Sequence, residues 1–383
     1  MVETRRVGFS RRRRAVGLTQ QDLAERLQVD VRSVGRWEAG TGEPQPWLRA
    51  RLARILEVDL DELEELLQVD HHDLISPITT GRTLITRADA EQIEQLAISL
   101  TTWDHAHGGS LARIAALAQA RWAVELLDAS ADPRVHMAVA TATAQLCLAA
   151  GHMAFDAQSH DDARSMFDFA LECAREGNSA RLEAKALSHQ ARQAIWCGQP
   201  DDALLLLDRA LKLPGLSGSE MAMLYTGQAR AHARLHRVCD ALVAIDNADQ
   251  AFEDHQAEEV PPWMAYYDRA QHLGDTGHAL FDLAVRGSRG PEAVSRLRGA
   301  VEGHDHGHPR SQVFSRTKLA ALLFACGDPQ EAVEVGFPAL GQVESLRSMR
   351  AVAGLREMLQ YTAHHHRLPD VAEFRDLARL TTA

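Results

Sequence analysis

The chain has 383 residues, of which 45% are hydrophobic and 5% aromatic, and its formal net charge is −12. This length allows two or three domains with buried cores, and a composition rich in alanine and leucine but poor in aromatic residues favours packed helices over sheets. The charged N-terminus gives no sign of a signal peptide, no apolar run approaches the roughly 20 residues that span a bilayer, and the cysteines show no CxxC spacing, so we expect a cytoplasmic protein.

Positive charge is concentrated at the N-terminus. Residues 1–56 contain twelve arginines and six acidic residues, a net charge of +6, which leaves −18 for the remainder of the chain. Charges further apart than a Debye length of about 8 Å are largely screened, so each part follows its own electrostatics. A basic N-terminal part can engage phosphates, while an acidic remainder resists non-specific contact with nucleic acid.

Five short helices are predicted in residues 1–67, which we call the head. Thr19 and Asp30 are good N-cap residues for the second and third helices, and Gly40 can end the third helix in a left-handed conformation. The predicted helices span residues 9–16, 20–27, 31–38, 47–56 and 60–67.

The head contains two closely spaced motifs, Thr19-Gln20-Gln21-Asp22-Leu23-Ala24 and Val34-Gly35-Arg36-Trp37-Glu38-Ala39-Gly40. Together they resemble the lambda-repressor-like helix-turn-helix family, also called the Cro/C1 or XRE type. The resemblance covers about residues 9–66. It implies a DNA-binding domain whose recognition helix is residues 31–38.

By this resemblance, the leading residues of the recognition helix point into the major groove: Val31, Arg32 and Ser33, with Arg36 one turn further on. Arg32 and Arg36 can each grip a guanine edge through two hydrogen bonds, which discriminates against other bases by about 1–3 kcal/mol. Val31 can lie against a thymine methyl group. The alternative for both arginines is an ordinary solvated surface position.

The same resemblance assigns the contacts that position the head on DNA. Gln20, at the start of the second helix, contacts a phosphate and supports the third helix. Arg12 and Arg13, in the basic run of the first helix, lie near phosphates. Glu38 is structural in this family, and Trp37 is expected to face either the core or the backbone; neither is expected to contact bases.

Residues 68–87 are predicted to be a linker, because Pro77, Gly81 and several serines and threonines interrupt the helical periodicity. A connecting helical hairpin then spans residues 88–132. Its two helices, 88–103 and 111–127, flank residues 104–109, whose composition predicts a turn.

Residues 133–383 repeat one pattern: an alanine, an apolar residue four positions later, and a small residue seven positions later. Small residues recur where paired helices approach within about 8–10 Å, and one hairpin cannot bury its own apolar face, so a stack of helical hairpins is predicted. An irregular bundle is the alternative. The copies begin at Ala163, Ala203, Ala241, Ala293 and Ala332, with a weaker sixth at Ala372/Asp376/Arg379.

These hairpins are similar to tetratricopeptide repeats, although the period is near 40 residues instead of 34. The combination with the head resembles actinobacterial regulators of the same layout and, more distantly, Gram-positive regulators that sense peptides. The resemblance implies a sensor and dimerisation domain whose concave face binds an effector. Arginines on that face can hold an anionic ligand or a peptide carboxylate, or can be ordinary salt-bridged residues. The candidate effector-binding residues are His152, Arg192, Trp196, Arg230 and Arg234.

No enzyme motif is present: the chain has no phosphate-binding glycine loop, no GxGxxG and no HExxH. The histidines of residues 304–308 and 364–366 lack the spacing of a structural zinc site. We therefore expect no catalytic residue, no metal and no cofactor.

The sequence thus predicts an all-α protein with a five-helix, lambda-repressor-like head followed by a tetratricopeptide-like α-solenoid. The expected function is transcription regulation by a homodimer that binds a double-stranded DNA operator and senses a small molecule or peptide. One alternative is a DNA-docked adaptor that recruits a protein and has no small effector. Another is a head that has lost DNA binding and serves only for interaction.

Overall fold

The computed structural model describes residues 7–39, 42–56, 58–67, 84–254, 262–304 and 308–382. The chain divides into two compact units, residues 1–82 and 83–383, and we call the second unit the body. Within the described residues the regular elements are helices, apart from one isolated bridge between Leu84 and Ser130. The predicted all-α architecture, with an N-terminal helix-turn-helix unit and a helical-repeat unit, is confirmed.

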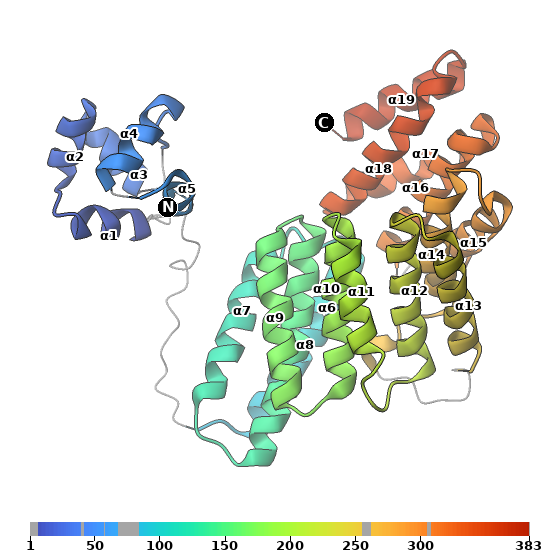
Figure 1. The fold of residues 1–383 in the computed structure, drawn as a ribbon, viewed down its shortest axis with the longest axis horizontal. Coiled ribbons are helices and arrows are strands. Elements are labelled where there is room, and N and C mark those ends of the chain that lie inside the picture. The colour runs from blue at the N-terminus through green and yellow to red at the C-terminus, as the bar shows by residue number, and fades with distance from the viewer. Residues whose placement is uncertain are drawn as a thin grey trace. The chain divides into compact units, whose positions relative to one another are not determined.

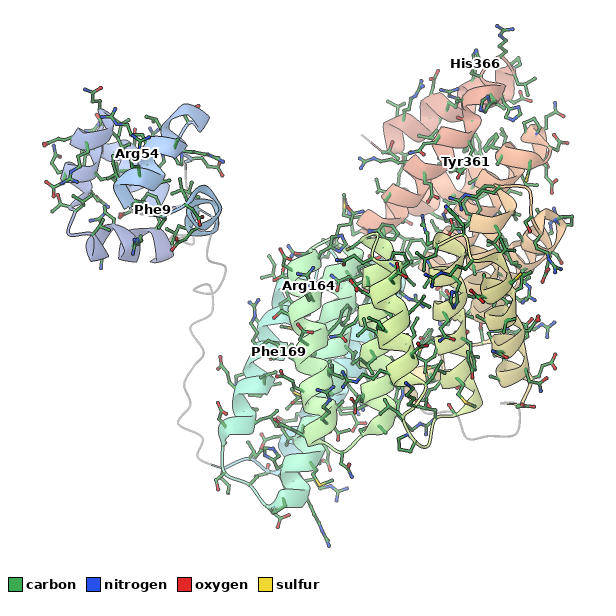
Figure 2. All side chains as sticks on the ribbon, viewed as in Figure 1. Phe9, Arg54, Arg164, Phe169, Tyr361 and His366 are labelled. Atoms are coloured by element: carbon green, nitrogen blue, oxygen red, sulfur yellow. The ribbon has the colours of Figure 1, made fainter. Side chains whose placement is uncertain are left out.

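The head consists of α1 (Val7–Ala15), α2 (Gln20–Leu27), α3 (Val31–Glu38), α4 (Pro46–Leu56) and α5 (Leu60–Leu67). Its core contains Phe9, labelled in Figure 2, together with Leu23, Val34, Leu52 and Leu63, all fully buried. These residues come from all five helices, so the head has a core of its own.

Local signals set the boundaries of α2 and α3. Thr19 and Asp22 form a reciprocal capping box at the start of α2. The Asp30 side chain accepts a hydrogen bond from the Arg32 amide at the start of α3. The predicted ranges of α2, α3 and α5 are confirmed, whereas α1 begins two residues and ends one residue before its predicted bounds, and α4 begins one residue early. Gly40, predicted to end α3, lies outside the described residues.

The body begins with α6 (Arg87–His107) and α7 (Arg113–Glu125), followed by the short 3-10 helix η2 (Leu126–Asp128). Helical hairpins then follow one another along the chain, and Figure 1 shows them in succession from green to red. The hairpins are α8 (Pro133–Asp156) with α9 (His160–Glu176), α10 (Ala180–Trp196) with α11 (Pro200–Ala210), α12 (Gly218–Arg234) with α13 (Val238–Asp254), α14 (Arg269–Ala284) with α15 (Gly290–Gly303), α16 (Pro309–Cys326) with α17 (Pro329–Ser345), and α18 (Met349–Tyr361) with α19 (Pro369–Thr381). Short 3-10 helices η4 (Pro262–Met264) and η5 (Thr362–His365) precede α14 and α19.

The repeated alanine pattern packs the hairpins. The leading alanine of each of the five clear copies is fully buried. Opposite one of them, Gly151 of α8 lies so close to Phe167 of α9 that an added Cβ would be 2.6 Å from the ring. First helices of consecutive hairpins also contact one another, which extends the stack. The sixth copy was placed wrongly: Ala372 is only half-buried, and Val371 and Ala378 carry the register instead.

The predicted turn at residues 104–109 was also wrong in its first four residues, because α6 continues to His107 and only Gly108 and Gly109 leave the helix. Nor do α6 and α7 pack mainly on each other. Both lie on α8, and the end of α6 also reaches α16. The two helices predicted as a connecting hairpin are therefore part of the body.

One helix of the described residues, Pro133–Asp156, is long and apolar enough to cross a membrane by length and composition. Its most apolar window is 78% buried inside the protein. This is the pattern of a central core helix, and here α6, α7 and α9 cover it.

Candidate nucleic-acid interface and candidate ligand cavity

The recognition helix predicted from the sequence, α3, has two distinct faces. Val34 and Trp37 are buried in the head. Arg32 and Arg36 are exposed, and Val31 is 36% exposed although it is apolar. A core-anchored helix with arginines and an uncovered valine on its outer face has the geometry that a major-groove reader needs.

Within the outer face, Ser33 is half-buried and its hydroxyl accepts a hydrogen bond of 3.3 Å from Arg36. An added Cβ at Gly35 would meet nothing within 4 Å, so the space beside the helix is open there. The four predicted base-reading residues therefore lie on one accessible surface. Their contact with bases stays a prediction.

Glu38 ties three helices of the head together. Its carboxylate accepts hydrogen bonds from Gln20 Nε2 at 2.5 Å and from Arg13 Nε at 2.6 Å. Gln20 thus supports α3 from the start of α2, and Glu38 is structural, as the sequence indicated. The phosphate contact of Gln20 stays a prediction.

The arginines in the basic run of α1 differ in their burial and in their hydrogen bonds. Arg13 is 6% exposed, pairs with Glu38, and also donates to the Leu18 carbonyl at 2.5 Å. A guanidinium already committed to internal acceptors has little left to offer a phosphate, so we remove Arg13 from the candidate DNA-contacting set. Arg12 is half-buried and donates its Nε to the Leu56 carbonyl at 2.8 Å, which fastens α1 to the end of α4.

The body contains a cavity of about 120 Å³ between the first helices of its hairpins and the end of α6. The cavity is lined by five helices of the stack, α8, α10, α12, α14 and α16, with α18 and α6 completing the wall. The five predicted effector residues all line this one cavity: His152, Arg192, Trp196, Arg230 and Arg234. Their role in binding an effector stays a prediction.

A buried ion pair closes one side of the cavity. Asp104 of α6 accepts two hydrogen bonds from Arg310 of α16, at 2.7 and 2.6 Å, and one from His152 Nδ1 at 2.8 Å. Burial alone would raise the pKa of Asp104, but Arg310 and His152 hold it well below its usual range. The His152 ring is thereby engaged with α6.

Further contacts at the C-terminal end of α6 reinforce the side of the cavity that the ion pair closes. Gly108 has a φ of +80°, and a Cβ there would be 2.8 Å from the Arg347 backbone. The Gly109 amide donates to Asp156 at 3.1 Å, and the Ser348 hydroxyl donates to the other oxygen of Asp156 at 2.8 Å. We call the group Asp104, Gly109, Asp156, Arg310 and Ser348 the brace, because it joins α6 and α8 to α16 and α18.

Most cations of the cavity have an acidic partner. In addition to Arg310 with Asp104, the pairs are Arg192 with Asp275 at 3.4 Å, Arg234 with Asp282 at 3.1 Å and Lys318 with Glu357 at 2.7 Å. Arg230 and Arg350 also line the cavity, and neither has an ion pair among the described residues. Burial, with repulsion from Arg192, lowers the pKa of Arg230.

Arg350 has no hydrogen-bond partner in the part of the chain that the structure describes. It is 8% exposed, and within the described part of the chain no acceptor reaches its Nε or Nη1. Its guanidinium lies over the rings of Phe155 at 4.4 Å and Phe314 at 4.8 Å. Burial, opposed by the attraction of Asp156, lowers its pKa to about 9, so it remains a cation at neutral pH.

Sequence reasoning missed Arg310 and Arg350. Arg310 is the second residue of α16 and Arg350 is the second residue of α18, so neither occupies the repeated first-helix position used for the prediction. Asp104 was noticed only as part of a turn.

Metal binding finds no support in the described residues, where no group of three or more His, Cys, Asp or Glu side chains could hold an ion. Part of the cluster at 304–308 lies outside them. In the 364–366 run, His365 Nε2 donates to the Phe324 carbonyl at 2.9 Å, which is a structural contact.

Comparisons with known proteins bear on the two units differently. Residues 9–66 match the family model described as a helix-turn-helix domain. An uncharacterized protein of Treponema pallidum (strain Nichols) is 30% identical over 148 residues, 37% of this chain, and the match spans only 21% of that relative's length. The crystal structure of Bacillus thuringiensis PlcR in complex with the peptide PapR7 and DNA covers 99% of both chains, with 12% identity and a TM-score of 0.32, which is too low to support an inference.

Proposed function

We propose that this DNA-binding transcriptional regulator, whose N-terminal unit is a helix-turn-helix domain, reads a specific operator through α3 and responds to an effector in its body. The observation that carries the proposal is the outer face of α3. Arg32 and Arg36 project from a helix that Val34 and Trp37 fix to the core, so both guanidiniums have a defined starting position. Such pre-positioning favours base reading over loose attraction to phosphates.

The proposed assembly is a homodimer on an inverted repeat. One small head supplies few base contacts, and two heads double them while fixing the spacing of the half-sites. The body would provide the dimer contact. The five cysteines are free thiols, which fits the reducing cytoplasm where we place the protein.

The proposed sensor is the cavity of the body. Its five predicted residues come from three different hairpins yet line one space, which supports a common role. His105 of α6 lines the same space. The other end of α6, at Arg87, lies directly after the bridge from Leu84 to Ser130, where the chain from the head enters the body. An effector that moves α6 would therefore act on the segment that leads to the head.

For regulation, the effector must bind one arrangement of the two heads better than the other, because equal affinity for both shifts nothing. Occupation of the cavity would change the position of α6 and hence the preferred head separation. The expected result is a change in operator affinity without any change in base preference.

In vitro selection of bound DNA fragments tests the reading function. We expect an inverted repeat, and the Arg32→Ala/Arg36→Ala variant should lose that preference while keeping weak binding to any DNA. If the double variant selects the same sequence as the natural protein, α3 is not the reader. If the natural protein selects no sequence, the head is an interaction module only.

The alternative of a DNA-docked adaptor predicts a different result in the body. A screen of small molecules and short peptides by thermal shift would then find no stabilising compound, and a protein would co-purify in stoichiometric amounts. A compound that raises the melting temperature and changes operator affinity supports the sensor instead.

A further inference from the structure

The size of the cavity limits its occupant. At about 120 Å³ it is slightly smaller than an engineered cavity of about 150 Å³ that accommodates a benzene molecule. Binding sites for drug-sized ligands are several times larger. The enclosed space therefore matches a small molecule, about as large as one ring with a substituent, better than it matches an extended peptide.

The charges of the cavity define the second property of the occupant. Arg230 and Arg350 both line it without an acidic partner in the described residues, whereas the neighbouring Arg192, Arg234, Arg310 and Lys318 are paired. Asp156 attracts Arg350 and Asp275 attracts Arg230, but without an ion pair of its own each desolvated cation stays costly until an anion enters.

Of the two arginines, Arg350 gives the more specific indication of an anionic ligand. Phe155 and Phe314 hold its guanidinium in place but supply no hydrogen-bond acceptor, and among the described residues its buried Nε and Nη1 have no partner. Buried donors in proteins are nearly always paired, so an unpaired pair of donors beside a cavity calls for an acceptor from outside the chain. A carboxylate or phosphate oxygen is the acceptor that a guanidinium prefers.

The aromatic wall supplies a third property. Trp196 lines the cavity and is 40% exposed, with its ring edge-on to Phe155 at a centroid distance of 6.0 Å. The Arg350 guanidinium lies 5.7 Å from the centroid of the indole ring, and the exposed remainder of the indole offers a flat apolar surface. A planar apolar group on the ligand can cover it.

We propose that the effector is a small organic anion whose carboxylate or phosphate binds Arg350 and Arg230 and whose planar apolar part packs on Trp196. This inference rests on the proposed sensing function and names its ligand class. Arg350 is then a specificity-determining residue, since it selects for the negative charge.

Calorimetric titration of the full chain tests the proposal with three probes. Benzoate and phenyl phosphate carry the anionic group on a ring, and benzamide has the shape of benzoate without the charge. We expect benzoate or phenyl phosphate to bind and benzamide not to bind. Replacement of Arg350 in Arg350→Met should weaken anion binding about tenfold or more, because a charge-assisted hydrogen bond is lost.

A ligand-free measurement separates a binding role from a structural one. An unpaired buried cation destabilises the fold, so Arg350→Met without ligand should melt at a higher temperature than the natural protein. Arg356→Met, at an exposed arginine of the same helix, should change neither the melting temperature in this direction nor anion binding. A lower melting temperature for Arg350→Met would show that this arginine holds the body together, and it would overturn the proposal.

The remaining outcomes distinguish this inference from the proposed function. Equal binding of benzamide and benzoate overturns the anion class but leaves the sensor intact. Binding of short peptides or neutral compounds alone does the same. Failure of every probe to bind, together with a stoichiometric protein partner, overturns the sensor as well. In each case, operator binding by Arg350→Met tests the head separately and should match that of the natural protein.

Discussion

In the head, the arginines of α3 project away from a small apolar core, whereas in the body five arginines of the first helices line a shared cavity. Arg32 and Arg36 are exposed. Arg310 and Arg350 are nearly completely buried. The same side chain thus occupies opposite environments in two units of one chain.

The surroundings of an arginine determine which interactions its guanidinium can still form. An exposed guanidinium keeps its hydration until it meets a base or a phosphate, and its interaction is weakened by salt. A buried guanidinium has already lost its water, so it must have a carboxylate partner or a ligand. Removing an exposed arginine should therefore affect DNA binding and leave folding intact, while disturbing a buried pair should affect the fold first.

The largest expected effect is the loss of operator recognition in Arg32→Ala/Arg36→Ala. Two guanine contacts at about 1–3 kcal/mol each correspond to a loss of roughly 30-fold to 10⁴-fold in specific affinity. Fluorescence anisotropy with the selected operator and a scrambled duplex measures it.

The matched control for this variant is Arg26→Ala/Arg54→Ala, which removes the same charge from exposed positions on α2 and α4; Arg54 is labelled in Figure 2. The control should weaken binding to both duplexes alike. A loss of preference in the control, or its retention in the α3 variant, would break the assignment of base reading to α3.

The next effect is on the stability of the body. Asp104→Asn leaves Arg310 buried without its bidentate carboxylate, and breaking a buried pair in this way costs about 3–5 kcal/mol. Hydrogen exchange followed by mass spectrometry should show faster exchange in α6 and α16, with no change in the head.

The exposed pair of Asp376 with Arg379 provides the control for Asp104. Asp376→Asn should cost less than about 1 kcal/mol, because exposed ion pairs contribute little. Equal effects of the two variants would contradict the distinction between buried and exposed charges.

Lowering the pH should destabilise the body more than the head, since residues 1–67 contain no histidine. In the body, burial with repulsion from Arg310 lowers the pKa of His105 to about 3. The folded body keeps this ring neutral, while the unfolded chain takes up a proton below about pH 6.5. Stability is full above that pH and falls as pH decreases toward 3, by about 2 kcal/mol at pH 5 for His105 alone.

Burial also lowers the pKa of His152, His189 and His278, so these rings act in the same direction. Urea unfolding at pH 7 and pH 5 measures the loss, with hydrogen exchange to assign it to the body. His105→Gln should reduce the difference between the two pH values. A parallel loss of protection in the head would show that the acid effect does not come from these histidines.

The smallest effect compares identical caps in the two units. Asp30 accepts from the Arg32 amide at 2.8 Å, and Asp132 accepts from the Arg134 amide at 2.9 Å. Replacement of either by alanine should cost about 1 kcal/mol. In the small head this should raise exchange in all five helices, whereas in the body it should stay within the first turn of α8. If the rise in hydrogen exchange extended equally far in both units, the head would not be the less stable unit.

The head could be predicted almost completely because its signals are local. The caps Thr19 and Asp30 mark helix starts within three residues of the groups they bind, and Val34 and Trp37 fall on one face by helical period. The burial of Arg13 could not be predicted from its local sequence because it depends on Glu38, which lies 25 residues away.

In the body, the spacing of the alanines predicted the hairpins. The five residues chosen as effector-binding candidates all line one cavity. The sequence could not place α6, because its position depends on Asp104 meeting Arg310, 206 residues further along. Gly108 and Gly109 correctly indicated the end of the helix. Residues 104–107, which are helical, were wrongly assigned to the same turn. Arg350 carries no local pattern, and only the packing of Phe155 and Phe314 around it makes it distinctive.

The brace also affects how the body folds. Arrays of stacked hairpins normally have contacts only between neighbours, so they fold from any point and fray from their ends. Here Asp104 with Arg310, and Asp156 with Ser348, connect segments about 200 residues apart in sequence. These contacts raise the mean sequence separation of the fold, which slows folding, and they link the unfolding of α16 and α18 to that of α6 and α8. The body therefore should lose its structure in one cooperative transition instead of one repeat at a time.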